Sequence, residues 1–261
     1  VDGKLIYDYV ELENDISDFA LLEASNASAP IKNIKLEAEG YTILDVNKDN
    51  IDYFGEVSRD YVSESITPVK TSVTGAKTEW ISGNTSVISD DGILSEVKVP
   101  QFVGITLKIT NPSDGRIYRE YTRELFADCS PLRNVFAGAS TAINSVPTSS
   151  MPKENAVDGK ILTAFEMNGL NTLARCITLD LGSEKTFNSV YVNADGIDGY
   201  TISVSPNNTS WTDVKTAAFS EGCKGSFVSF GSMATARYVR LTADKNSNAS
   251  AKIYEIKGYI N

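Results

Sequence analysis

The sequence of 261 residues contains no histidine. This absence excludes Ser-His-Asp triads, Cys-His dyads and histidine-ligated zinc or copper sites, because each of these needs an imidazole. The sequence also lacks an apolar run of the roughly 18 residues that a membrane-spanning helix needs. No signal peptide opens the chain at Val1, so we expect either a cytosolic protein or a mature chain whose export signal has been removed.

Basic residues and cysteines are both scarce. The chain has 24 lysines and arginines against 34 aspartates and glutamates, a net charge of −10, and no basic stripe of the kind that binds a phosphate backbone. Nucleic acid is therefore not expected as a partner. The three cysteines, Cys129, Cys176 and Cys223, are too few and too far apart for a CxxC metal site or a dense disulfide framework. Their number fits one disulfide with one free thiol and fits three reduced thiols equally well.

All of the net charge lies in the first half of the chain. Residues 1–133 hold 13 basic and 23 acidic side chains, which gives −10, whereas residues 134–261 hold 11 of each, which gives zero. A turn-like segment, Asp128-Cys-Ser-Pro131, separates the halves. Because the chain is about 1.7 times as long as a typical domain of roughly 150 residues, these features predict two domains, 1–133 and 134–261.

Short runs rich in Val, Ile, Thr and Tyr predict that the first half is built from strands. The turn Asn111-Pro-Ser-Asp-Gly115 joins two alternating runs and predicts a hairpin, whereas residues 49–65 fit either a short helix or two strands. We expect an acidic β-sandwich of immunoglobulin type, to which no sequence feature assigns a role. Its predicted strands are 5–12, 31–38, 41–46, 86–88, 93–99, 103–110 and 116–126.

The second half is also rich in strands, and its apolar–polar alternation predicts a sandwich or jelly roll. The fold class expected for the whole chain is all-β, with two β-sandwich domains. In the run Arg237-Tyr-Val-Arg-Leu241, alternation places Arg237 on the apolar face beside Val239. The predicted strands are 177–181, 187–192, 200–205, 227–230, 237–242 and 253–259.

Six short motifs follow one another in the second half. They are Asn155-Ala-Val-Asp-Gly159 with Thr163, Ile177-Thr-Leu-Asp-Leu-Gly182, Tyr200-Thr-Ile-Ser-Val-Ser205, Trp211, Ala236-Arg-Tyr-Val-Arg-Leu241 and Ile253-Tyr-Glu-Ile256. In their order and spacing, residues 134–261 resemble the discoidin family, also called coagulation factor 5/8 type C, whose glycan-binding members form a carbohydrate-binding module family. The resemblance implies a discoidin-like jelly roll, and the first half resembles no family that we recognise.

The loop at 155–163 offers hard oxygen ligands, because Asp158 lies in a glycine-containing turn and Thr163 follows it. In the family that the chain resembles, this loop commonly holds a structural calcium ion. The resemblance implies Asp158 and Thr163 as ligands, with Glu255 as a carboxylate from the last strand. The alternative is that Asp158 only closes the turn and that Glu255 is a charge at the end of a strand. The calcium ion that the resemblance implies is the one cofactor that we expect, since no EF-hand or zinc spacing marks a second metal site elsewhere.

The resemblance also implies that a ligand binds at loops on one end of the barrel, here 165–175, 193–199 and 245–250. Sugar recognition needs an aromatic face for the ring and planar polar groups for the hydroxyls. Phe165 stands where the family usually has Trp, and the end-to-end disulfide of many members is absent, which leaves Cys176–Cys223 as the pairing to consider. The candidate ligand-binding residues are Phe165, Glu166, Asn168, Asn171, Arg175, Lys245, Asn246 and Asn248.

These features predict a non-catalytic carbohydrate-binding protein, secreted or anchored at a bacterial surface or outer membrane, with the N-terminal sandwich as a spacer or docking domain. The expected partner is a glycan or glycoconjugate, with a protein partner for the acidic half as a further option. Adhesion through protein or lipid head-group ligands is the alternative. A glycoside hydrolase needs two carboxylates, but the pairs Asp90–Asp91 and Glu11–Glu13 carry little weight among 34 acidic residues, so no enzyme is expected.

Overall fold

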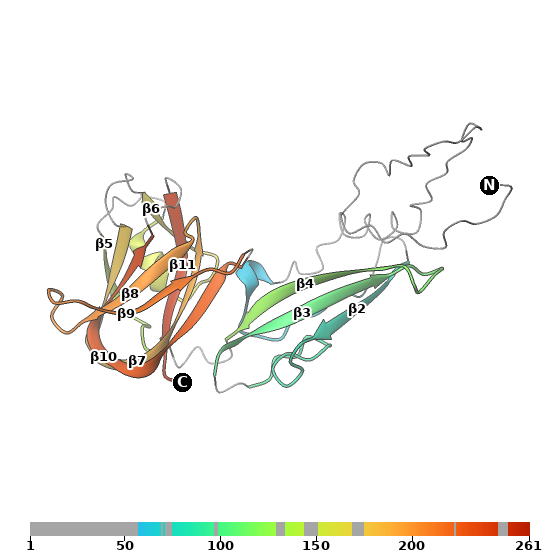
Figure 1. Ribbon diagram of the computed structural model, residues 1–261, viewed down its shortest axis with the longest axis horizontal. Helices are drawn as coiled ribbons and strands as arrows, with labels where there is room; N and C mark the ends of the chain where they lie inside the picture. Colours follow the sequence, from blue (N-terminus) through green and yellow to red (C-terminus); the bar gives the residue numbers. More distant parts are fainter. Residues whose placement is uncertain are drawn as a thin grey trace, which may run out of the picture. The chain divides into compact units, whose positions relative to one another are not determined.

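The computed structural model describes residues 57–68, 70, 75–96, 99–128, 134–143, 151–168, 175–221, 223–244 and 250–261. All of these belong to one compact unit, residues 38–261. The described residues form two β-sheets with short 3-10 turns and no α-helix (Figure 1), which confirms the all-β prediction. None of the helical turns in this described part has the length and apolar character needed to cross a bilayer.

The first sheet has four strands in the order β1-β4-β3-β2. They are β1 (Tyr61–Val62), β2 (Lys77–Ser82), β3 (Gln101–Thr110) and β4 (Tyr118–Ala127), preceded by the 3-10 turn η1 (Ser58–Asp60). Alternate residues of β3, namely Val103, Ile105, Leu107 and Ile109, are buried in a core that also contains Trp80. This is the period of two that one buried sheet face requires.

The predicted hairpin is confirmed, because β3 and β4 pair antiparallel with Thr110 opposite Tyr118. Asn111 supports its turn. The Asn111 Oδ1 atom accepts hydrogen bonds from the backbone N–H groups of Ser113, at 2.8 Å, and Asp114, at 3.3 Å. Such a side-chain acceptor fixes a turn without help from the rest of the fold.

The strands predicted at 86–88 and 93–99 are wrong, since the described residues there meet only in an isolated bridge between Ile88 and Leu94. Between them the Gly92 N–H donates to the Ser89 carbonyl at 2.8 Å, and Gly92 has a φ of +77°. Strand β2 was not predicted, because Trp80 is its one buried residue and no alternation shows. Segment 49–65 contains η1 and β1 in its described part, and the strands predicted before residue 57 lie outside the described residues.

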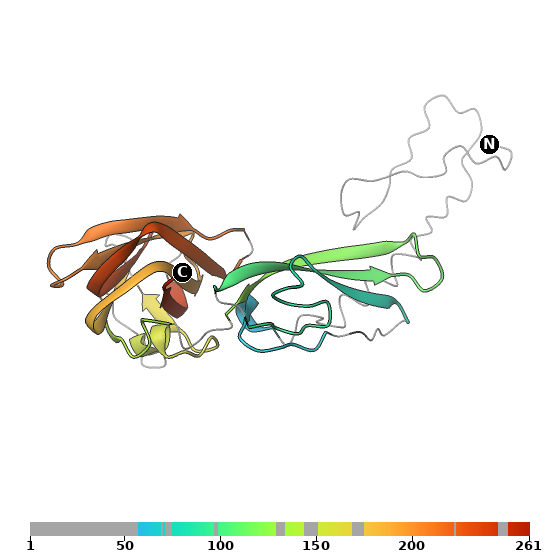
Figure 2. The same ribbon diagram turned by 90° about the horizontal axis from the view of Figure 1, so that it is seen from below.

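The second sheet has seven strands in the order β6-β11-β7-β10-β8-β9, with β5 paired to β7. Strands β7 and β10 are long and pass through both layers of a sandwich (Figure 2). The strands are β5 (Ser140–Ile143), β6 (Phe165–Asn168), β7 (Arg175–Asp195), β8 (Gly199–Ser205), β9 (Thr212–Ala218), β10 (Gly225–Ala243) and β11 (Ser250–Tyr259), and the turn η3 spans Lys153–Val157.

The two layers follow from the pairing register. The first part of β7 pairs with β5 and its last part pairs with β11, while β10 changes register between Ser229 and Ala234. A register shift of this kind bends a strand and lets it cross from one layer to the other. Fully buried rings fill the space between the layers, among them Phe136 and Phe187, which meet edge to face at 4.9 Å.

Arg237 does not lie on the apolar face, so that prediction is wrong. The pairing of β10 with β7 is irregular between Ala236 and Tyr238, and this irregularity turns Arg237 outward. Its guanidinium forms two hydrogen bonds with the Asp180 carboxylate, at 2.8 and 2.9 Å. A Cys176–Cys223 bond is likewise not formed, because both residues are free thiols. Cys129 lies outside the described residues.

Candidate functional site

The pairing of the strands brings the ends of the three predicted ligand loops to one end of the sandwich. Strand β6 ends opposite the start of β11, β11 continues opposite the end of β7, and the start of β7 lies opposite the end of β10. The Asp244 N–H also donates to the Gly199 carbonyl at 3.0 Å. The register pairs at this end are Asn168–Ser250, Lys252–Asp195, Arg175–Ala243 and Tyr200–Ala243.

The prediction that Phe165 contacts a ligand at this end of the sandwich is wrong. Phe165 opens β6 opposite Ile253 of β11 and is fully buried in the apolar core. A ring with no exposed surface has no face to offer a sugar. The sequence interpretation treated 165–175 as one loop, and the strand formed by its first four residues turns Phe165 inward.

Glu166 follows Phe165 on the opposite face of β6, is half-buried, and lies opposite Lys252. It therefore keeps an accessible carboxylate beside the converging loops. The backbone positions of Asn168 and Arg175 mark the two edges of the segment between β6 and β7. Asn171, Lys245, Asn246 and Asn248 lie outside the described residues and stay predictions.

Arg59, which lies in the turn η1 of the first half, binds the start of the loop 193–199. Asn193 is fully buried, and its side-chain oxygen accepts a hydrogen bond from the Arg59 Nε at 2.7 Å. Asp195 pairs with Arg59 at 2.8 Å and with Lys224 at 3.1 Å. Burial alone would raise the pKa of Asp195, but the hydrogen bonds from Arg59 and Lys224 outweigh it and hold that pKa below its usual range.

The predicted cation loop is closed by Asp158. One of its carboxylate oxygens accepts the Lys160 N–H at 2.9 Å, and the other accepts the Thr163 hydroxyl at 2.8 Å. The alternative interpretation, that Asp158 closes the turn, thus has direct support. Gly159, with a φ of +79°, supplies the left-handed residue that this turn needs.

Glu255, the third predicted cation ligand, lies in the interior of the protein. It is fully buried, and neither carboxylate oxygen has a hydrogen-bond partner among the described residues. Burial raises the pKa of Glu255 to about 8, and the nearby Asp158 carboxylate adds to the rise, whereas Lys257 and the Gly159 N–H partly oppose it. Neither the Gly159 N–H nor any other described donor reaches hydrogen-bonding geometry with this carboxylate.

The side chains predicted as cation ligands, Asp158, Thr163 and Glu255, offer oxygen atoms, which suit a hard cation better than zinc. Within the described ranges, no group of three or more His, Cys, Asp or Glu side chains gathers at one point. An ion held by Asp158 and Glu255 would complete its coordination with neutral oxygens, such as the Thr163 hydroxyl and backbone carbonyls. Calcium accepts such mixed oxygen ligands.

Comparison with protein families gives one match. The model of the F5/8 type C domain matches residues 139–256. Residues 139–256 form an F5/8 type C domain. No curated protein matches the chain.

Two of the solved structures similar to this chain are carbohydrate-binding modules. Chitosan-binding module 2 of a chitosanase/glucanase from Paenibacillus sp. IK-5, solved with chitotriose, is 25% identical, with a TM-score of 0.44, and the match covers 48% of this chain and 99% of that one. The family 32 module of Clostridium perfringens NanJ, solved with galactose, is 23% identical, with a TM-score of 0.41, and the match covers 46% and 93%.

The carboxylate pairs considered for catalysis do not form a site in the described residues. Asp90 and Asp91 lie in the turn before Gly92, where Asp90 accepts the Ser82 N–H at 2.7 Å and Asp91 pairs with Lys70 at 2.7 Å. Both carboxylates therefore serve local contacts. Glu11 and Glu13 lie outside the described residues.

A cleft of about 780 Å³ lies beside the turn at Asp158 in the F5/8 type C domain. Its lining includes Asp158, Leu162 and Lys257 from this domain, together with Tyr61 and Glu64 from the first half. None of the described lining residues is a predicted glycan ligand, so the cleft and the loop end are separate features.

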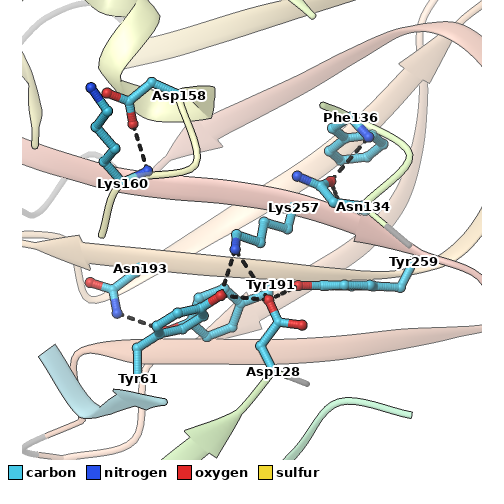
Figure 3. A network of polar contacts seen from close by, with 11 residues as sticks. Tyr61, Asp128, Asn134, Phe136, Asp158, Lys160, Tyr191, Asn193, Lys257 and Tyr259 are labelled. Atoms are coloured by element: carbon cyan, nitrogen blue, oxygen red, sulfur yellow. Dashed lines mark hydrogen bonds and ion pairs between the residues drawn. The ribbon is translucent and has the colours of Figure 1, made fainter. Parts of the chain in front are cut away.

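Sequence reasoning missed a polar network between the F5/8 type C domain and the first half (Figure 3). The Asp128 Oδ2 atom accepts hydrogen bonds from the hydroxyls of Tyr61, at 2.6 Å, and Tyr259, at 2.8 Å, and pairs with Lys257 at 3.1 Å. Asp128 is fully buried and the Lys257 side chain is 6% exposed. No sequence signal pointed to this network, because Lys257 lies in a strand, β11, that also contains Lys252 and Glu255.

Proposed function

We propose that this chain is a non-catalytic glycan-binding protein that acts outside the cell, secreted or displayed at the surface. The observation that carries the proposal is the convergence of three loop ends in a domain whose family includes carbohydrate-binding modules. The residues proposed to contact the glycan are Glu166, Asn168, Asn171, Arg175, Lys245, Asn246 and Asn248.

These residues offer carboxylate, amide, guanidinium and ammonium groups, which hydrogen-bond to sugar hydroxyls in defined directions. Because Phe165 is buried, the proposal rests on hydroxyl recognition and not on stacking against that ring. The acidic first half serves as a spacer or docking domain in this proposal.

A glycan array on the full chain tests the proposal, followed by calorimetric titration of each sugar that binds. Arg175→Ala is expected to weaken binding at least about tenfold, because loss of a charged hydrogen-bond donor at a binding site costs roughly 1.5–3 kcal/mol. Arg116→Ala is the matched control, since the Arg116 side chain is 90% exposed in the β3–β4 turn. Equal effects of the two substitutions would contradict the proposed site.

Absence of binding to every glycan on the array, by a chain shown to be folded, would contradict the proposed function. Adhesion through a protein or lipid head-group ligand would then be the function to test. Lipid vesicles and plain glycan-free beads in the same assay separate these outcomes.

We also propose a structural calcium ion held by Asp158, Thr163 and Glu255. The unpartnered, buried carboxylate of Glu255 supports it, because an isolated buried charge is costly unless a cation neutralises it. When bound, the ion would supply the positive charge that lets two neighbouring carboxylates stay ionised. Its role in this proposal is to stabilise the loop and the last strand, not to contact the glycan.

Thermal unfolding with calcium and with chelator tests the calcium site. Calcium at about 100 times its dissociation constant is expected to add about 2.7 kcal/mol to the free energy of unfolding. Glu255→Gln should abolish this gain, whereas Glu184→Gln, an exposed glutamate on β7, should retain it. A gain that survives Glu255→Gln, or no gain in the unsubstituted chain, would refute the site.

A further inference from the structure

The outer face of one layer of the F5/8 type C domain is buried. Along β7, Val190, Val192 and Ala194 belong to the core of the sandwich. The alternate residues point the other way, yet Ser189, Tyr191 and Asn193 are also fully buried. In an antiparallel sheet that packs on one side only, such positions face water, so something covers this face.

Aromatic rings from the first half cover it. Phe126 of β4 stacks on Tyr191 with ring centroids 4.0 Å apart and an interplanar angle of 10°. Phe126 also meets Phe227 at 5.3 Å. Phe126, Tyr191 and Tyr259 have no exposed surface and form a core of their own, separate from the cores of the two sheets. This third core consists of residues from both halves.

The polar contacts at this face are also made between the halves. Asp128 follows β4, and it accepts its hydrogen bonds from Tyr259 and Lys257 of β11 as well as from Tyr61 (Figure 3). Separation of the halves would take both Asp128 and Tyr61 away from the Lys257 ammonium, and it would leave Asp128 with the Tyr61 hydroxyl as the one remaining member of its three partners. Loss of one partner of such a buried pair is far more costly than loss of an exposed one.

The turn η1 forms a second polar attachment. Arg59 and Asp60 both have a φ of 58°, a left-handed conformation that side chains other than glycine, asparagine and aspartate rarely adopt. Arg59 bonds to Asn193 and Asp195, and its guanidinium lies 3.2 Å from the centre of the Tyr254 ring. Asp60 pairs with Arg123 and accepts the Lys224 N–H at 3.2 Å. Contacts across the halves thus hold an unfavourable backbone conformation in place.

We propose that residues 57–128 and 134–261 fold and unfold as one cooperative body, and that this face of the F5/8 type C domain is a permanent docking surface for the acidic half. The third core and the two polar attachments carry this inference, which does not depend on glycan binding. It makes the first half a rigid support for the loop end, because Arg59 holds the start of the loop 193–199.

The chain contains two tryptophans, and they report on the two halves separately. Trp80 lies in β2 of the first sheet, and Trp211 lies just before β9 of the second. The experiment is urea unfolding of the full chain labelled with 5-fluorotryptophan, followed by fluorine NMR. One cooperative body predicts that the two resonances lose their native signal at the same urea concentration.

Two substitutions sharpen this test. Ile109→Val removes one methylene from the core of the first sheet, away from the interface, and is expected to lower both midpoints by the same amount. Phe126→Ala removes the ring at the centre of the interface and is expected to separate the midpoints. Different midpoints in the unsubstituted chain would overturn the proposal, as would an Ile109→Val shift confined to Trp80. The first two measurements decide the question even if Phe126→Ala does not fold.

Discussion

Burial decides what several individual residues do in this protein. Phe165 and Glu255 were both predicted as ligand residues from a family resemblance, and both are fully buried. For Phe165 this burial contradicts the prediction, because a ring enclosed in the apolar core cannot contact a ligand in solvent. For Glu255 the same burial strengthens the prediction, because its carboxylate has no hydrogen-bond partner among the described residues. Sequence alone does not separate these cases, since exposure is a property of the folded chain.

A glycine provides the sharpest test at this scale. A Cβ atom at Gly258 would overlap the ring of Phe136, which is itself fully buried. Gly258→Ala is therefore expected to lower the free energy of unfolding by about 1–3 kcal/mol or more, through overpacking. Urea denaturation measures the change. The control is Gly115→Ala, where a Cβ would meet nothing within 4 Å and the expected change is within about 0.5 kcal/mol. Similar values for the two variants would contradict this account.

At the scale of strands, the sequence predicted the long elements and missed the short ones. Strands β3, β4, β7, β8, β10 and β11 each overlap a predicted segment, because apolar and polar residues alternate along them. Strand β9 was missed because none of its residues is buried, so it has no apolar pattern. Strands β5 and β6 have four residues each, too few for a periodicity to show. The missing β6 led directly to the error at Phe165.

The β3–β4 hairpin allows a prediction about a single element. Asn111→Ala removes the side-chain oxygen that accepts two backbone N–H groups in the turn. We expect the free energy of unfolding to fall by about 0.5–1.5 kcal/mol, because the turn loses the acceptor of two backbone hydrogen bonds. Asn111→Asp keeps a carboxyl oxygen at the same place and should lose less. Thermal melts of both variants measure the difference, and an equal loss would show that the turn does not depend on this acceptor.

At the scale of the whole molecule, the charge is divided between two parts with different expected partners. Residues 1–133 carry the entire net charge of −10, and residues 134–261 carry none. Recognition of a neutral glycan at the loop end should therefore depend little on salt, whereas a protein partner of the acidic half should be released by it. We expect the glycan dissociation constant to change less than about twofold between roughly 0.05 and 0.5 M salt. A large loss of affinity with salt would place the binding on the acidic half.

The contact between the halves could not be predicted from the sequence. Asp128 was interpreted as part of a turn at a domain boundary, and the partner residues Lys257 and Tyr259 are separated from it by about half of the chain. Pairings between residues that lie so far apart in the chain leave no local pattern in the sequence. What the sequence did predict, a strand-rich chain whose second half resembles one family, depends on periodicity and on motif order, both of which are local.

The shared aromatic core also bears on how this domain can be inherited and engineered. Recombination that cut the chain near residue 130 would separate the F5/8 type C part from the first half and expose Tyr191, Phe227 and Tyr259. In a new fusion protein, this exposed aromatic surface would promote aggregation. A graft that carries residues 57–261 together keeps that surface closed. The transferable unit is thus larger than the segment that the family model matches, and its boundary lies before the turn that contains Arg59.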